Sequence, residues 1–322
     1  MHRPAPHPAA LAALALSLCS LHAGAAPVAS ASTDVSYHYA TVDCIRIFYR
    51  EAGDQANPTI LLLHGFPSSS RMFRELMPRL ATQFHLIAPD YPGMGHSEAP
   101  PADKFTASFD SVAAVTEHLV EQLGQKKVIV YEQDFGGPVG MRLAVHHPDW
   151  VAGLIIQNTP VSLDGWDPAR LQAVEASAGP VTPEKRAKAE ARVVAATAEY
   201  LHKQGTRKPD ALNPDDWESD AYTMSKPESR RIMTDLQLDI VNNLALYDSW
   251  QAWLRLYQPK TLVVWGRADP IFAPAGALAV KKAVPSAEIV FYETGHFALE
   301  EDGADIARRI AATFAAAPAK RR

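Results

Sequence analysis

Short apolar segments rich in β-branched residues alternate along the chain with stretches of helical periodicity. This alternation predicts a single α/β domain with a mostly parallel sheet covered by helices. Eight strands are expected, at residues 35–42, 45–50, 59–63, 85–88, 128–131, 154–157, 262–265 and 288–292. Helices are expected at residues 70–82, 109–123, 137–147, 274–283 and 303–315.

The alternation stops after Pro160 and resumes after Gln258. The intervening segment has few strand-like runs, and its Ala, Glu, Lys and Arg content is typical of helices. We expect a helical lid at 161–257, inserted into a core made of residues 26–160 and 258–322.

The first residues have the pattern of an export signal. A weakly basic start is followed by an apolar run at 9–21 and by small residues up to Ala26. This order is typical of a secretory signal peptide, and the run is too short to cross a membrane. We expect residues 1–25 to be removed during export, to a bacterial periplasm; the alternative is a buried or unstructured N-terminal segment.

Composition narrows the possible functions. The chain of 322 residues has 31 Lys and Arg against 36 Asp and Glu, a net charge of −5. Nucleic acid is therefore not an expected partner, and neither is an anionic membrane surface. Cys19 and Cys44 are too few for a four-cysteine zinc site or a disulfide framework, so no metal site and no cofactor are expected. We do not expect an integral membrane protein, and the sequence does not predict an oligomeric state.

Candidate catalytic residues follow three of the predicted strands. The chain reads EQDFGGP at 132–138, which places Asp134 where a strand turns into a helix; helix capping is the alternative role for this Asp. Asp269 and His296 follow the strands at 262–265 and 288–292. The order nucleophile, acid, histidine is that of the α/β-hydrolase triad, although the usual Gly-x-Ser-x-Gly turn is absent.

Further motifs carry a family resemblance over residues 36–315. The chain reads HGFP at 64–67, DYPGMGHS at 90–97 and QDFGG at 133–137. These segments resemble the α/β-hydrolases of the epoxide hydrolase and haloalkane dehalogenase branch, in which Asp replaces Ser as the nucleophile. The resemblance implies an α/β-hydrolase fold with an eight-stranded, mostly parallel sheet and an inserted helical lid.

The resemblance also implies roles for individual residues. Asp134 would attack a carbon to form an alkyl-enzyme ester, His296 would activate the water that hydrolyses the ester, and Asp269 would orient His296. The backbone N–H groups of Phe66 and Phe135 would form the oxyanion hole, and their side chains would line an apolar substrate pocket. His64 and Asp90 are expected to orient their loops.

The sequence does not decide between two substrate classes, which differ in their leaving group. Both classes imply a small hydrophobic substrate and water. A halide calls for N–H donors, typically including a Trp after the nucleophile, and this chain has Phe135 there. An epoxide calls for an acid, and the lid offers Tyr247 as a substrate-binding residue, with Tyr200 and Tyr222 elsewhere in it. Epoxide hydrolysis to a diol is therefore favoured. Haloalkane dehalogenation and a non-catalytic binding module are the alternatives.

A dehalogenase of the fluoroacetate type is less expected. Such a site needs arginines close to the nucleophile, and only Arg142 follows soon after it. Glu132 lies two residues before the nucleophile, where a small residue is usual. The sequence leaves its role open between a solvated residue, a paired residue and a modifier of the histidine's surroundings.

Overall fold

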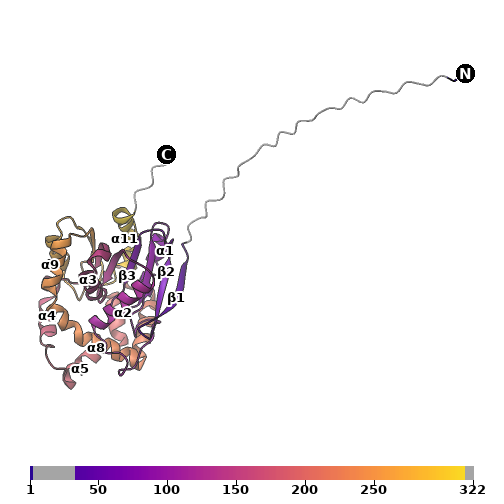
Figure 1. Ribbon diagram of the computed structural model, residues 1–322. Helices are drawn as coiled ribbons and strands as arrows, with labels where there is room; N and C mark the ends of the chain where they lie inside the picture. Colours follow the sequence, from indigo (N-terminus) through magenta and orange to yellow (C-terminus); the bar gives the residue numbers. More distant parts are fainter. Residues whose placement is uncertain (3–32, 316–322) are drawn as a thin grey trace. The chain divides into compact units, whose positions relative to one another are not determined.

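A computed structural model describes residues 1–2 and 33–315. The predicted signal peptide therefore lies, apart from Met1 and His2, outside the described residues. Residues 33–315 all fall within one compact unit (Figure 1). None of the helices in this range is both long and apolar enough to cross a membrane.

The core of this unit is a sheet that contains all eight predicted strands. In chain order they are β1 (Val35–Val42), β2 (Ile45–Ala52), β3 (Thr59–Leu63), β4 (His85–Pro89), β5 (Val128–Gln133), β6 (Val151–Gln157), β7 (Thr261–Gly266) and β8 (Glu288–Tyr292). Their order across the sheet is β1-β2-β4-β3-β5-β6-β7-β8. β2 runs antiparallel to both β1 and β4, and the remaining pairs are parallel. The predicted α/β fold with a mostly parallel sheet is confirmed.

The strand ends differ from the prediction where polar residues are buried. β5 continues through Glu132 and Gln133, because Glu132 lies opposite Leu63 on β3 and Gln133 lies opposite Gln157 on β6. Every residue of β3, β4 and β5 is buried, as expected for central strands covered on both faces.

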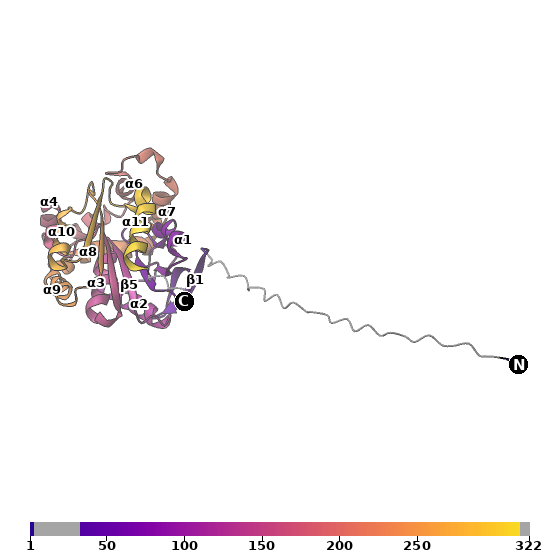
Figure 2. The same ribbon diagram turned by 90° about the horizontal axis from the view of Figure 1, so that it is seen from above.

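Helices cover both faces of the sheet (Figure 2). α1 (Leu76–Leu80) packs against α11 (Leu299–Phe314), whereas α2 (Phe109–Gln122) packs against α3 (Gly136–His146) and α10 (Ala275–Ala283) packs against β7. The single helix predicted at 70–82 is wrong, because the segment divides into a 3₁₀ turn at Ser70–Phe73 and α1. Pro78 explains the division, since it has no N–H to continue a helix from Arg74 but fits the first turn of a new one.

The segment between β6 and β7 is helical, as the sequence pattern indicates. It contains α4 (Pro168–Glu175), α5 (Pro183–Glu190), α6 (Ala195–Lys203), α7 (Pro214–Ser225), α8 (Pro227–Leu244) and α9 (Tyr247–Tyr257). On α9 the buried residues Trp250, Trp253 and Leu254 pack into the core. We call residues 161–257 the lid.

Candidate active site

Asp134 lies at a sharp turn between β5 and α3. Its φ of 49° is in the left-handed region, which a residue other than Gly rarely adopts. Such strain is typical of the turn that presents a nucleophile at the end of a strand. The turn also requires Gly136, because a Cβ there would collide with the backbone carbonyl oxygen of Leu63 on β3. The Asp134 carboxyl is consequently held at the carboxyl end of the sheet.

Two backbone N–H groups point at this carboxyl. The N–H of Phe66 donates a hydrogen bond to Oδ1 of Asp134 over 2.7 Å, and the N–H of Phe135 also acts on the carboxyl and lowers its pKa. Burial raises the pKa of Asp134 above its ordinary value, against the opposing effects of His296 and the two N–H groups. Phe66 and Phe135 therefore occupy the predicted oxyanion-hole positions.

The imidazole of His296 lies between the two predicted acids. Its Nδ1 is 3.0 Å from Oδ2 of Asp269, and its Nε2 is 3.8 Å from Oδ2 of Asp134. Burial lowers the pKa of His296, but the Asp269 carboxylate and, to a smaller extent, Asp134 outweigh burial and leave it raised. The structure thus brings the three predicted residues together in the geometry of a triad. Their catalytic roles stay predictions.

Two neighbouring amides complete this arrangement. The side chain of Asn158, directly after β6, donates to Oδ2 of Asp269 over 2.7 Å and also bonds to the backbone of Gly266. The amide nitrogen of Gln133 lies 2.9 Å from Nε2 of His296. With Gln133 as donor, Nε2 carries a lone pair and the ring proton is on Nδ1, facing Asp269. This is the neutral form that a general base requires.

A cavity of about 450 Å³ lies between this cluster and the lid. Its floor includes Asp134 and His296, and much of its lining is apolar. The apolar and aromatic lining residues are Phe66, Phe109, Phe135, Pro138, Pro160, Trp166, Ala169, Ala173, Val174, Tyr200, Leu201, Ile240, Tyr247, Ile271 and Phe272. A mostly apolar cavity with a few polar groups at one end is typical of a small-molecule site.

Comparisons with known proteins give the family. The model of the alpha/beta hydrolase fold family matches residues 58–303. The chain belongs to the α/β-hydrolase fold family. It is 38% identical over 287 residues to an uncharacterized hydrolase of Saccharomyces cerevisiae, a match that covers 85% of this chain and 94% of that protein. The protein is therefore a hydrolase.

Two further similarities point to the branch of this family. The chain is 39% identical over 127 residues to a soluble epoxide hydrolase from a Corynebacterium species, covering 39% of this chain and 42% of that protein. The solved structure of haloalkane dehalogenase DbeA from Bradyrhizobium elkani matches with a TM-score of 0.72 and 25% identity, over 87% of this chain and 99% of that one. The predicted resemblance to the epoxide hydrolase and dehalogenase branch is confirmed.

The lid tyrosines of this α/β-hydrolase differ in position. Tyr247 is only 4% exposed and lines the cavity, and its hydroxyl accepts a hydrogen bond from the indole N–H of Trp166 over 2.9 Å. Burial raises the pKa of Tyr247, so its hydroxyl stays protonated. Tyr200 also lines the cavity, whereas Tyr222 is exposed and does not.

His64 and Asp90 have loop-orienting contacts, in agreement with the prediction. Nε2 of His64 accepts a hydrogen bond from the N–H of Tyr91 over 3.2 Å. The Asp90 carboxylate accepts the N–H groups of Ser70 and His96, over 2.7 and 2.8 Å. These contacts hold the two loops beside the oxyanion hole.

Glu132 has neither of the first two roles that the sequence left open, a solvated or a paired residue. Its side chain is fully buried, so it is not solvated, and neither carboxyl oxygen has a hydrogen-bond partner among the described residues, so it is not paired. Burial raises its pKa well above the ordinary value and so favours the neutral form of this carboxyl. Gly140 on α3 makes room for it, because a Cβ there would collide with a carboxyl oxygen of Glu132.

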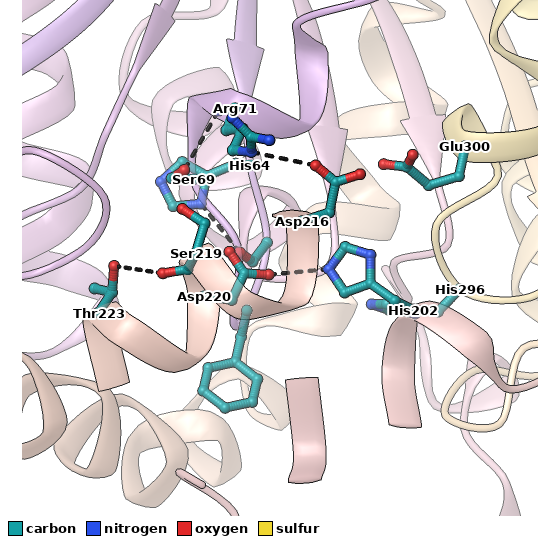
Figure 3. A network of polar contacts seen from close by, with 12 residues as sticks. His64, Ser69, Arg71, His202, Asp216, Ser219, Asp220, Thr223, His296 and Glu300 are labelled. Carbon is teal, nitrogen blue, oxygen red and sulfur yellow. Dashed lines mark hydrogen bonds and ion pairs between the residues drawn. The ribbon is translucent and has the colours of Figure 1, made fainter. Parts of the chain in front are cut away.

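Lid helices contact the core close to His296 (Figure 3). Asp216 on α7 pairs with Arg71 over 3.2 Å and with Arg74 over 2.7 Å, and burial together with Glu300 raises its pKa to about 6. His202 on α6 hydrogen-bonds to Asp220 over 2.9 Å and stacks on Phe297, with ring centroids 4.1 Å apart. Because Phe297 follows His296, these contacts join the lid to the histidine loop.

Sequence reasoning missed several residues of this site. Asn158 could have been found, because it directly follows a strand at the same edge of the sheet as Asp134. Arg170 and Arg192 line the cavity from the lid, and no motif marks them. Arg142 does not line the cavity and pairs instead with Asp110, over 2.5 Å. Among the described residues, no group of three His, Cys, Asp or Glu side chains is placed to hold a metal ion.

Proposed function

We propose that this hydrolase uses Asp134 as a nucleophile, forms an alkyl-enzyme ester and opens epoxides to diols. The observation that carries the proposal is the shared cavity. Oδ1 of Asp134 accepts the N–H of Phe66, His296 faces Oδ2, and Tyr247 lines the same space.

In the first step, Oδ2 of Asp134 attacks an epoxide carbon. The C–O bond of the ring breaks, and the released alkoxide takes the proton of the Tyr247 hydroxyl. Since that hydroxyl accepts its hydrogen bond from Trp166, its own proton is available to a substrate oxygen. The product of this step is an ester between the substrate and Asp134.

In the second step, His296 takes a proton from water, and the water oxygen attacks Cγ of Asp134. The negative charge develops on Oδ1, where the N–H groups of Phe66 and Phe135 stabilise it. Collapse of this intermediate breaks the ester bond, and the departing alkoxide takes the proton on His296. The carboxylic acid proton of Asp134 returns to the Tyr247 phenolate, which regenerates the Asp134 carboxylate. Asp269 stabilises the positive charge that His296 carries in between.

Haloalkane dehalogenation is the second candidate, supported by similarity to DbeA. The donors that would hold a halide are less evident than the proton donor for an epoxide. Phe135 has no side-chain donor, and the N–H of Trp166 is engaged by Tyr247. Epoxides are therefore the favoured substrates.

Trapping the ester tests the proposal. His296→Gln protein incubated with an epoxide and, separately, with a bromoalkane should gain the mass of the substrate or of its alkyl group, because the first step proceeds and the second does not. Asp134→Asn protein is the matched control and should gain no mass. Absence of an adduct with every electrophile would favour the non-catalytic binding module, and an adduct with the bromoalkane alone would favour dehalogenation.

We also propose that the chain is exported and loses residues 1–25. The apolar run at 9–21 and the small residues that follow it support this proposal. N-terminal sequencing of material from a periplasmic fraction should begin near Ala26, and an intact Met1 would contradict export with cleavage.

A further inference from the structure

Two arginines from separate parts of the lid line the cavity that contains Asp134. Arg170 is on α4, and Arg192 is in the connection between α5 and α6. Neither guanidinium has an ion-pair or hydrogen-bond partner among residues 33–315. Lid arginines outside the cavity include paired ones, such as Arg186 and Arg231, which both contact Asp235.

Both arginines line the cavity that also contains Asp134 and His296. Partial burial and then the like charge of Arg170 lower the pKa of Arg192, although part of its side chain is exposed. The positive charge of Arg170 lowers the pKa of His296. This effect is smaller than that of burial, which also lowers the pKa, and smaller than that of Asp269, which raises it. Two positive charges placed together without an acidic partner repel each other, and an anion between them would reverse that repulsion.

No acidic residue of the cavity lining is available to these arginines. Asp134 is the only acid among the lining residues, and its carboxyl receives the N–H groups of Phe66 and Phe135. The rest of the lining is largely apolar and includes Phe135, Val174 and Ile271. The cavity therefore has a nucleophile on its floor, a largely apolar lining and two positive groups that come from the lid.

We propose that Arg170 and Arg192 form an anion-binding subsite for an oxyanion group, carboxylate or phosphate, on the end of the substrate remote from its epoxide. The inference rests on the proposed function for the identity of the reacting group. It extends that function by naming a substrate class, an epoxide with an apolar body and an anionic end. The planar, multidentate guanidinium suits a carboxylate or phosphate better than a point charge does.

Both arginines are exposed, so they lie where the cavity opens to solvent. An anion bound there keeps part of its hydration, and salt weakens its attraction to the arginines. We accordingly expect each arginine to contribute about tenfold to selectivity for an anionic substrate, the magnitude of one hydrogen bond to a charged group.

Matched substrates test this subsite in catalysis. Terminal epoxides of alkanoic acids with six to ten carbons are compared with the corresponding primary amides, as the ratio of kcat/KM values. The wild-type protein should prefer the acids, and Arg170→Gln and Arg192→Gln should each reduce that ratio about tenfold, with little change for the amides. Arg230→Gln is the control, because Arg230 is an exposed lid residue outside the cavity lining. An equal ratio in wild type, control and both variants would overturn the proposal.

A binding measurement separates this inference from the proposed function. Titration calorimetry with hexanoate, hexyl phosphate and hexanamide needs no turnover. Binding of either anion that exceeds binding of the amide and is lost in Arg170→Gln and Arg192→Gln supports the subsite, even if no epoxide reacts. The tighter of the two anions identifies the group. Turnover of neutral epoxides together with equal binding of all three probes would leave the proposed function standing and overturn the subsite.

Discussion

The indole N–H of Trp166 donates a hydrogen bond to the hydroxyl of Tyr247 over 2.9 Å, and both side chains line the cavity that contains Asp134. This contact has two consequences for the leaving group. It engages an N–H group that could otherwise hold a halide, and it leaves the proton of Tyr247 available to an oxygen. The same hydrogen bond thus disfavours one chemistry and favours the other.

Removing the Tyr247 hydroxyl should slow epoxide opening. In Tyr247→Phe protein we expect kcat/KM for epoxides to fall by about 10²-fold or more, which is the usual contribution of a general acid. Any halide release from bromoalkanes should change little, because a halide needs no proton. Tyr222→Phe makes the same chemical change on an exposed lid residue and should retain wild-type rates. Unchanged epoxide turnover in Tyr247→Phe would remove this residue from the role of acid.

The pKa of His296 should fall when the ester forms. In the free protein the Asp134 carboxylate is one of the charges that raise this pKa, and esterification removes that charge. His296 acts as a base only when neutral, so ester hydrolysis should speed up as the pH rises through its pKa. We predict a lower midpoint for single-turnover ester hydrolysis than for the NMR titration of His296 in the free protein. Equal midpoints would show that Asp134 does not influence the histidine.

Glu132 should make folding stability depend on pH. Its ordinary pKa is 4.5, and burial raises the folded-state value well above that. Between the two values the unfolded chain releases a proton that the folded protein keeps, so the free energy of unfolding falls as the pH rises. Relative to Glu132→Gln, the wild-type protein should lose about 1.4 kcal/mol per pH unit in that window.

Urea unfolding of both proteins at several pH values measures this difference. The exposed Glu218 provides the control, because Glu218→Gln should leave the wild-type dependence on pH unchanged. Parallel stability curves for wild type and Glu132→Gln would mean that Glu132 ionises in the folded protein much as it does in the unfolded chain.

The sheet and the triad could be predicted because both depend on short local patterns. Buried parallel strands such as β3 and β7 are continuous apolar runs, and Asp269 and His296 directly follow two strands that end at the same edge of the sheet. Asp134 could be placed because the glycines after it permit a tight turn. The order of these segments along the chain was sufficient to predict that the three residues lie close together.

The lid side of the cavity could not be predicted in the same way. Arg170, Arg192 and Trp166 reach the cavity through the packing of short helices, and a helical pattern does not specify which face meets the core. The surroundings of Glu132 could not be predicted either, because they depend on tertiary packing. They are formed by the neighbouring strand β3 and by Gly140 on the covering helix α3. Long-range packing decides both features.

The central claim is that Asp134, and not water, attacks the substrate. A single turnover in H₂¹⁸O, with the protein in excess over an epoxide, tests it directly. We predict that the first diol molecules carry unlabelled oxygen and that ¹⁸O appears in the peptide that contains Asp134, because water attacks Cγ of the ester. Labelled diol in the first turnover with no ¹⁸O in that peptide would contradict the account.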